Sequence, residues 1–200
     1  LETAHNRAAE YQRELQSLNR ELLSTNRDLE TAALYDHLTG LPNRCLIQER
    51  MEQQLQISQR DRHPFSIVMI DLDRFKEVND TLGHHVGDEL LTQIGRRFTQ
   101  MLRQSDTIGR LGGDEFAVIL PGTPVHGAKT VAENIRVSFS EGKLKRVKTS
   151  EYLGTISISV GAAQYRTGEA VEDLVERSDR ALYSAKDAGR NCVATESGLT

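Results

Sequence analysis

The stretch RLGGDEFAVIL places two adjacent acids, Asp114 and Glu115, on a bend between two apolar runs. Gly112 and Gly113 permit a tight bend, because glycine adopts backbone conformations that other residues rarely adopt. A third acid, Asp71, ends the apolar run FSIVMID. Carboxylate oxygens are the ligands that Mg²⁺ takes, and Mg²⁺ usually binds phosphate oxygens as well. The alternative is an exposed hairpin turn, where Gly and Asp are common without any ligand.

A second set of residues has side chains that suit a nucleotide. A carboxylate such as Asp88 can accept hydrogen bonds from N1 and N2 of guanine, and an amide such as Asn79 can meet O6 or N3. Helix capping by Asn79 and a helix-terminal charge at Asp88 are ordinary structural alternatives. Lys186 and Arg190 can neutralise phosphates, although the helix macrodipole also favours cations near a helix C-terminus. His84 follows Gly83, and a histidine at the edge of a loop is usually just solvated.

The elements that must position these residues follow from the apolar patterns. We predict strands at residues 65–71, 107–111, 116–120, 155–163 and 192–194, and helices at residues 44–60, 74–81, 84–104, 124–141 and 170–188. This order is the ferredoxin-like βαββαβ unit, an α+β fold with an antiparallel central sheet. Its first strand lies beside its third, so Asp71 should meet Asp114 and Glu115 at one end of the sheet.

Residues 1–35 differ from the rest of the chain because they contain neither Gly nor Pro. Small or apolar residues recur there at a 3-4 spacing, namely Ala4, Ala8, Tyr11, Leu15, Leu18, Leu22, Thr25, Leu29 and Ala32. This pattern predicts the seam of a coiled coil, and a parallel homodimer would bury it. A single amphipathic helix packed on its own domain is the alternative.

Composition restricts the class of protein. The chain has 200 residues, of which 38% are hydrophobic, and its net charge of −4 argues against a broad nucleic-acid surface. Cys45 and Cys192 match no metal-ligand spacing, so we expect two reduced thiols and a cytoplasmic location. No apolar run approaches the roughly 20 residues of a membrane span, and no signal peptide is recognisable. Because the first residue is Leu1, we expect a fragment of a longer protein, which could be membrane-anchored upstream.

Five motifs in order resemble the GGDEF domains, the diguanylate cyclases of bacteria, over about residues 36–195. They are DHLTGLPNR, DLDRFKEVNDTLGHHVGDELL, RQSDTIGRLGGDEFAVIL, ISISVGAA and RSDRALYSAKDAGRN. The resemblance implies a nucleotidyl-cyclase-like domain at residues 36–195, after a coiled-coil signalling and dimerisation helix at residues 1–35 and before a tail at residues 196–200. It also implies an enzyme that joins two GTP molecules into cyclic di-GMP and releases two pyrophosphates, using Mg²⁺ or Mn²⁺. The active form would be a homodimer under an upstream sensor domain.

The resemblance implies roles for the acids at the bend. Asp71 and Asp114 would bind the metal ion with the carbonyl of Leu72. Asp114 and then Glu115 are candidates for deprotonating the attacking 3′-hydroxyl, and a metal-held hydroxide is the alternative base.

Substrate contacts are also implied by the resemblance. Asn79 and Asp88 would recognise guanine, and His84 lies in the same segment. The residues implied at the phosphate end are Phe75, Lys76, Lys186 and Arg190.

Arg103 and Asp106 fit the Arg-x-x-Asp motif that binds cyclic di-GMP as an inhibitor in this family. A helix-ending cation and a turn-initiating Asp are the structural alternative. Family members often add an arginine from the helix after the hairpin, but this chain has Asn134 there and its nearest arginine is Arg136.

Three other functions remain open from the sequence. The domain could be a silent receptor for GTP or cyclic di-GMP, although silent members usually lose the acids that this chain keeps. It could regulate a phosphodiesterase domain located after residue 200. Residues 1–35 could also be the only functional element, as a dimerisation stalk.

Overall fold

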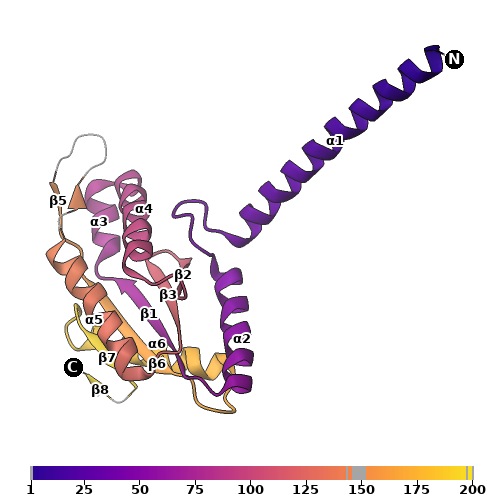
Figure 1. The fold of residues 1–200 in the computed structure, drawn as a ribbon. Coiled ribbons are helices and arrows are strands. Elements are labelled where there is room, and N and C mark those ends of the chain that lie inside the picture. Colours follow the sequence, from indigo (N-terminus) through magenta and orange to yellow (C-terminus); the bar gives the residue numbers. More distant parts are fainter. Residues whose placement is uncertain (1, 143, 146–151, 197, 200) are drawn as a thin grey trace. The chain divides into compact units, whose positions relative to one another are not determined.

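The computed structural model describes residues 2–142, 144–145, 152–196 and 198–199 (Figure 1). Its internal contacts divide the chain into two units, Leu1–Tyr35 and Asp36–Thr200. The first unit is one long helix, α1 (Glu2–Leu34). Four leucines of its predicted seam are each more than half exposed, namely Leu15, Leu18, Leu22 and Leu29. Their apolar surface is therefore not covered within the first unit itself.

The second unit is built around a six-stranded sheet with the strand order β2-β3-β1-β6-β7-β8. The strands are β1 (Phe65–Leu72), β2 (Thr107–Gly112), β3 (Glu115–Pro121), β6 (Ile158–Gln164), β7 (Val193–Thr195) and β8 (Gly198–Leu199). Strand β1 is central and runs antiparallel to both β3 and β6. The order β2-β3-β1-β6 is that of the ferredoxin-like unit, so the predicted fold class is confirmed.

Helices cover both faces of this sheet. They are α2 (Arg44–Asp61), α3 (Phe75–Leu82), α4 (His84–Met101), α5 (Val125–Glu141) and α6 (Val171–Asp187). Residues of α4 and α5 form one buried cluster with Val68, Ile70 and Leu72 of β1. Residues of α2 and α6 form a second cluster with Ile67 and Met69 of the same strand. Because β1 is buried on both faces, its sequence is a continuous apolar run.

Helix α4 ends at Met101, three residues before the predicted end at residue 104, so that boundary was wrong. The carboxylate of Asp106 accepts the backbone N–H of Arg103 at 3.0 Å. The N–H of Asp106 in turn donates to the carbonyl of Arg103 at 3.0 Å. These two bonds form a turn that replaces the last predicted helical turn.

Three short strands were not among the predicted elements. A separate two-stranded sheet pairs β4 (Leu144–Lys145) with β5 (Tyr152–Gly154). Strand β8 pairs with β7 and lies inside residues 196–200, which we expected to be a tail. Both are pairings of two or three residues, which are too short to produce a recognisable apolar alternation.

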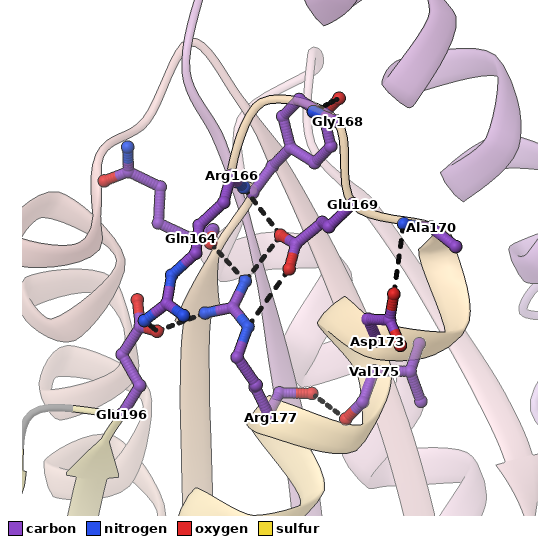
Figure 2. Close-up of polar contacts among 11 residues, drawn as sticks. Gln164, Arg166, Gly168, Glu169, Ala170, Asp173, Val175, Arg177 and Glu196 are labelled. Atoms are coloured by element: carbon purple, nitrogen blue, oxygen red, sulfur yellow. Dashed lines mark hydrogen bonds and ion pairs between the residues drawn. The ribbon is translucent and has the colours of Figure 1, made fainter.

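An ion-pair network around Arg177 anchors helix α6 beside Gln164, the last residue of β6 (Figure 2). The bend is at the other end of β6, where Ser159 pairs with Asp71. Arg177, whose side chain is only 10% exposed, pairs with Glu169 at 2.5 Å and also with Glu196. Its Nη2 donates to the carbonyl of Gln164 at 2.7 Å. A guanidinium with this many partners in a fixed geometry holds its surroundings rigidly. The network fixes the position of α6, whose other end carries Lys186.

Candidate active site

The strand pairing brings the three acids to one end of the sheet. Asp71 is the register partner of Glu115 across the β1–β3 pair. The N–H of Leu72 donates to the backbone carbonyl of Asp114 at 3.2 Å. Asp71 is buried, Asp114 is half-buried and Glu115 is exposed. The acids predicted to meet at this end are therefore adjacent, on two strands linked by backbone hydrogen bonds.

The two glycines of the bend are required by backbone conformation. Gly112 has a φ of +147° and Gly113 a φ of +52°, which residues with a Cβ rarely adopt. A Cβ built on either glycine would meet no atom within 4 Å. The space around them is open, so any larger residue would strain the turn without clashing.

Two arginines outside the predicted site hold the bend. Arg110 donates to the carbonyl of Gly113 through Nε at 3.0 Å and Nη2 at 2.8 Å. Its Nη1 binds both carboxylate oxygens of Asp36, at 3.0 and 3.1 Å. Burial alone would raise the pKa of Asp36, but hydrogen bonds from Thr39 and Arg110 outweigh burial and hold this pKa below its usual value. Arg110 therefore joins the first residue of the second unit to the glycine turn.

Arg44, at the start of α2, holds the other side of the same bend. Its Nε donates to the carbonyl of Leu111 at 3.0 Å. Its Nη2 lies 3.8 Å from the carboxylate of Glu115, at an exposed position. Both arginines lie inside motifs that the sequence analysis quoted, but no pattern in the sequence indicated which carbonyls they bind.

Asp71 pairs with a cation from α6. Its Oδ2 lies 2.7 Å from Nζ of Lys186. Burial raises the pKa of the Asp71 carboxyl, Lys186 opposes this, and the negative charges of Asp114 and Glu115 raise it further. The net shift is upward, because burial outweighs the effect of Lys186 and the two neighbouring acids add to it.

The chemistry of these oxygens fits a hard divalent cation such as Mg²⁺. The carboxylate oxygens of Asp71 at the end of β1 and of Asp114 on the bend are ligands of the kind such an ion takes. In the part of the chain that the structure describes, no group of three or more His, Cys, Asp or Glu side chains is arranged to hold a metal ion. An ion at this end would therefore combine the carboxylates of Asp71 and Asp114 with a backbone oxygen and substrate oxygens.

The predicted guanine contacts lie on helices α3 and α4. Gly83, with φ of +86°, joins the two helices, and its N–H donates to the carbonyl of Asn79 at 2.9 Å. The amide of Asn79 lies against Gly87, since a Cβ built there would overlap Asn79 Oδ1. Asp88 and His84 are both exposed on α4. Asn79 of α3 therefore lies against Gly87, the residue of α4 that directly precedes Asp88.

The residues predicted to contact phosphate differ in how far their side chains are exposed. The side chain of Phe75 is buried in the core, so only its backbone can face a ligand. Lys76 is exposed in the first turn of α3, after Arg74, whose φ is +57°. Arg190 is exposed and also has a positive φ, +67°.

Asp73 is a positioning residue that the sequence analysis missed. Its buried carboxylate accepts the hydroxyls of Ser157 at 2.7 Å and Ser159 at 2.6 Å. It also accepts the backbone N–H of Asn191 at 3.0 Å. The only signal in the sequence was an acid directly after a buried strand. Through these bonds Asp73 ties the start of α3 to the loop that carries Arg190.

Arg103 and Asp106 lie away from the acidic end. They form the turn before β2, and the bend follows at the opposite end of that strand. Arg103 is exposed and Asp106 is half-buried. Arg136, the arginine nearest to Asn134, donates to Glu133 at 2.8 Å and to Asn191 Oδ1 at 3.1 Å. Arg136 therefore has partners within its own domain.

Comparison with known proteins assigns the family. The model of the diguanylate cyclase GGDEF domain matches residues 33–192. The chain therefore belongs to the GGDEF domain family. The chain is 42% identical over 171 residues to the bifunctional diguanylate cyclase/cyclic di-GMP phosphodiesterase MucR of Pseudomonas aeruginosa. This match covers 85% of this chain and 24% of MucR. The chain is 39% identical over 169 residues to the diguanylate cyclase DgcM of Escherichia coli, covering 82% of this chain and 39% of DgcM. The chain thus spans 24% of the length of MucR and 39% of that of DgcM.

Solved structures agree with this assignment. The coiled coil and GGDEF domain of DgcB from Caulobacter crescentus, in complex with c-di-GMP, matches with a TM-score of 0.83 and 32% identity. That match covers 96% of this chain and 98% of the DgcB chain. The diguanylate cyclase SiaD from Pseudomonas aeruginosa, in complex with its activator SiaC, matches with a TM-score of 0.77 and 36% identity over 95% of this chain and 72% of SiaD. No helix in the described ranges is both long and apolar enough to span a membrane.

Proposed function

We propose that this chain is a magnesium-dependent diguanylate cyclase that condenses two GTP molecules into cyclic di-GMP and two pyrophosphates. The observation that carries the proposal is the meeting of Asp71, Asp114 and Glu115 at one end of the sheet, with Lys186 on Asp71. In each half of the reaction a 3′-oxygen attacks an α-phosphorus. The bond from that phosphorus to pyrophosphate breaks, and the proton of the hydroxyl passes to a base.

The metal ion would be held by the carboxylates of Asp71 and Asp114 and the carbonyl of Leu72. When bound, Mg²⁺ or Mn²⁺ supplies positive charge to the phosphates as they react. The ammonium group of Lys186 lies 2.7 Å from the carboxylate of Asp71 and can also meet a phosphate oxygen. Asp114 and Glu115 are the acids available to accept the 3′-proton. Arg44 and Arg110 hold the bend on which both acids lie.

The substrate would lie between the acidic end and the α3–α4 surface. Asn79 and Asp88 would meet the guanine edge, and His84 lies next to them on α4. The buried side chain of Phe75 leaves its backbone N–H for phosphate contact, as the first N–H groups of a helix have no partner within the helix. Lys76 and Arg190 would neutralise phosphate charge.

Dimerisation through α1 would bring two GTP-loaded domains together. One domain carries one such acidic end, whereas the product contains two nucleotides. The exposed leucines of α1 would be buried in a parallel coiled coil of residues 1–35. In a longer protein this helix would connect the cyclase domain, residues 36–195, to an upstream sensor.

Cyclic di-GMP would inhibit the enzyme at Arg103 and Asp106. A guanidinium can meet a phosphate, or O6 and N7 of guanine, with two hydrogen bonds, and a carboxylate can accept from N1 and N2. Arg136 is bonded to Glu133 and Asn191, so it would have to leave these partners to join the site. We therefore expect inhibition to depend mainly on Arg103 and Asp106.

The test is to incubate the chain with GTP and MgCl₂ and to quantify cyclic di-GMP and pyrophosphate by chromatography. We expect both products in a 1:2 ratio, loss of both with EDTA, and little product from ATP. ATP would leave Asp88 facing the N1 acceptor of adenine, which costs about 1–3 kcal/mol. GTP binding without any product would contradict the proposal and indicate a silent receptor.

A further inference from the structure

A cavity of about 330 Å³ lies between α2 and α6, on the sheet face that these two helices cover. Its apolar lining includes Ile47 and Met51 of α2, Met69 of β1, Leu111 of β2 and Val175 of α6. Ile47, Met51 and Met69 belong to the buried cluster between these helices and the sheet, so the cavity lies at the edge of that cluster. None of the residues to which we assign metal or GTP contacts lines the cavity. It is therefore a separate hollow in the second unit.

The rim of the cavity is negatively charged. Glu172, Glu176 and Asp179 of α6 lie on it, against a single cation, Arg44. Arg44 is directed towards the carbonyl of Leu111 and towards Glu115. Glu176 pairs with Arg180 only at 3.8 Å and with both side chains exposed, which gives little compensation.

Asp179 lies on the rim within the electrostatic reach of Glu115, Arg44 and Lys186. Burial raises the pKa of its carboxyl and the nearby Glu115 raises it further, while Arg44 and Lys186 lower it. The net direction is upward, because burial by its neighbours outweighs the two cations. The Asp179 side chain is nevertheless exposed on the rim, where a cation from outside the chain can reach it.

We propose that this cavity binds a small organic cation with an apolar body, such as an arylalkylammonium ion. The apolar body would lie on the methionine and aliphatic floor, and the ammonium group would lie at the rim near Asp179. The volume is at the lower end of the roughly 300–1,000 Å³ of ligand pockets. The same rim disfavours anions, which distinguishes this cavity from the proposed GTP site.

An occupant of the cavity would lie against residues that hold the catalytic bend. Leu111 directly precedes Gly112, and Arg44 binds both the carbonyl of Leu111 and the carboxylate of Glu115. Binding that shifts either residue would alter the position of Glu115. A change in turnover on binding rests on the proposed function, whereas binding itself does not.

Methyl NMR of ¹³C-methionine tests the binding directly. The chain has three methionines, of which Met51 and Met69 line the cavity and Met101 ends α4. The probe is 4-phenylbutylamine, and its matched controls are neutral 4-phenylbutanol and anionic 4-phenylbutyrate. We expect the amine to cause saturable shifts of the Met51 and Met69 signals and to leave the Met101 signal unchanged. Both controls should cause smaller shifts of the Met51 and Met69 signals.

Asp179→Asn should weaken binding of the amine about three- to fivefold, as expected for loss of a partly exposed ion pair. It should leave binding of the alcohol unchanged. Three outcomes would overturn the proposal: no shift of Met51 and Met69 at millimolar amine, equal shifts with all three probes, or equal affinity of Asp179→Asn for the amine. Because these signals are read without GTP, they stand even if the chain makes no cyclic di-GMP.

Discussion

Replacing Gly87 with Ala should weaken GTP binding while leaving the protein folded. A Cβ at residue 87 would overlap Oδ1 of Asn79, lie 3.0 Å from its Cγ and lie 3.2 Å from Cζ of Phe75. The Asn79 amide can turn aside because it is half-buried at the surface, whereas Phe75 is buried in the core. The methyl group should therefore displace the amide from its place against Gly87, next to Asp88 in α4.

The expected magnitudes follow from opposing effects. Ala is about 1 kcal/mol more favourable than Gly inside a helix, and this gain offsets the cost of moving Asn79. The free energy of unfolding should therefore change by less than about 1 kcal/mol. Loss of one hydrogen bond to guanine costs about 0.5–1.5 kcal/mol, so KM for GTP should rise up to about tenfold.

A double-mutant cycle isolates the contact between Gly87 and Asn79. In an Asn79→Ala background the amide is absent, so Gly87→Ala should have little further effect on KM and should stabilise the helix. The assay is steady-state cyclic di-GMP formation over a range of GTP concentrations, with urea unfolding of all four proteins. An unchanged KM in Gly87→Ala, or the same loss in both backgrounds, would refute this explanation.

Three further variants test other parts of the structure. Arg110→Met should lower the free energy of unfolding by about 2 kcal/mol at pH 7, as expected for lost hydrogen bonds to a charged group. Because the pKa of Asp36 is lowered in the folded protein, this stabilisation is present above about pH 4 and is lost as pH falls through the lowered pKa. Urea unfolding at pH 7 and pH 3 should therefore show a smaller difference between variant and wild type at pH 3, and an equal difference would contradict the assignment. Replacing Leu18 and Leu22 with Asp should lower specific activity at dilute protein and shift the chain towards monomer in sedimentation, whereas unchanged values would show that α1 does not pair the domains. Arg103→Ala should keep its initial rate while its progress curves continue where those of the wild type slow, and equal slowing by added cyclic di-GMP would return Arg103 to a structural role.

Much of the site's framework could be predicted because it follows from topology. A continuous apolar run ending in Asp71 predicted a central strand, and the βαββαβ order placed that strand beside the third. Those two inferences were enough to predict that Asp71 and the bend meet at one end. The register Asp71 to Glu115 confirms this position, whereas the chemical roles of the acids stay predictions.

Contacts that join distant segments could not be predicted in the same way. Asp73 binds the Asn191 N–H 118 residues away, and Arg110 binds Asp36 74 residues away. Side-chain bonds of this kind leave no periodic pattern in the sequence, since each depends on how loops pack in space. The predicted end of α4 was wrong for a related reason. The side chain of Asp106, in the following turn, accepts a backbone N–H and so competes with the last helical hydrogen bonds.

The most direct test of the central claim is the turnover of Asp114→Asn at saturating GTP and Mg²⁺. Leu72 bonds the backbone carbonyl of Asp114, so the substitution leaves that contact in place. Asp61→Asn, an exposed acid at the far end of α2, is the matched control. If Asp114 binds the metal or takes the 3′-proton, kcat should fall on the order of a thousandfold, equivalent to about 4 kcal/mol, with Asp61→Asn near the wild type. A folded Asp114→Asn protein that retains kcat within a few-fold of Asp61→Asn would contradict the account.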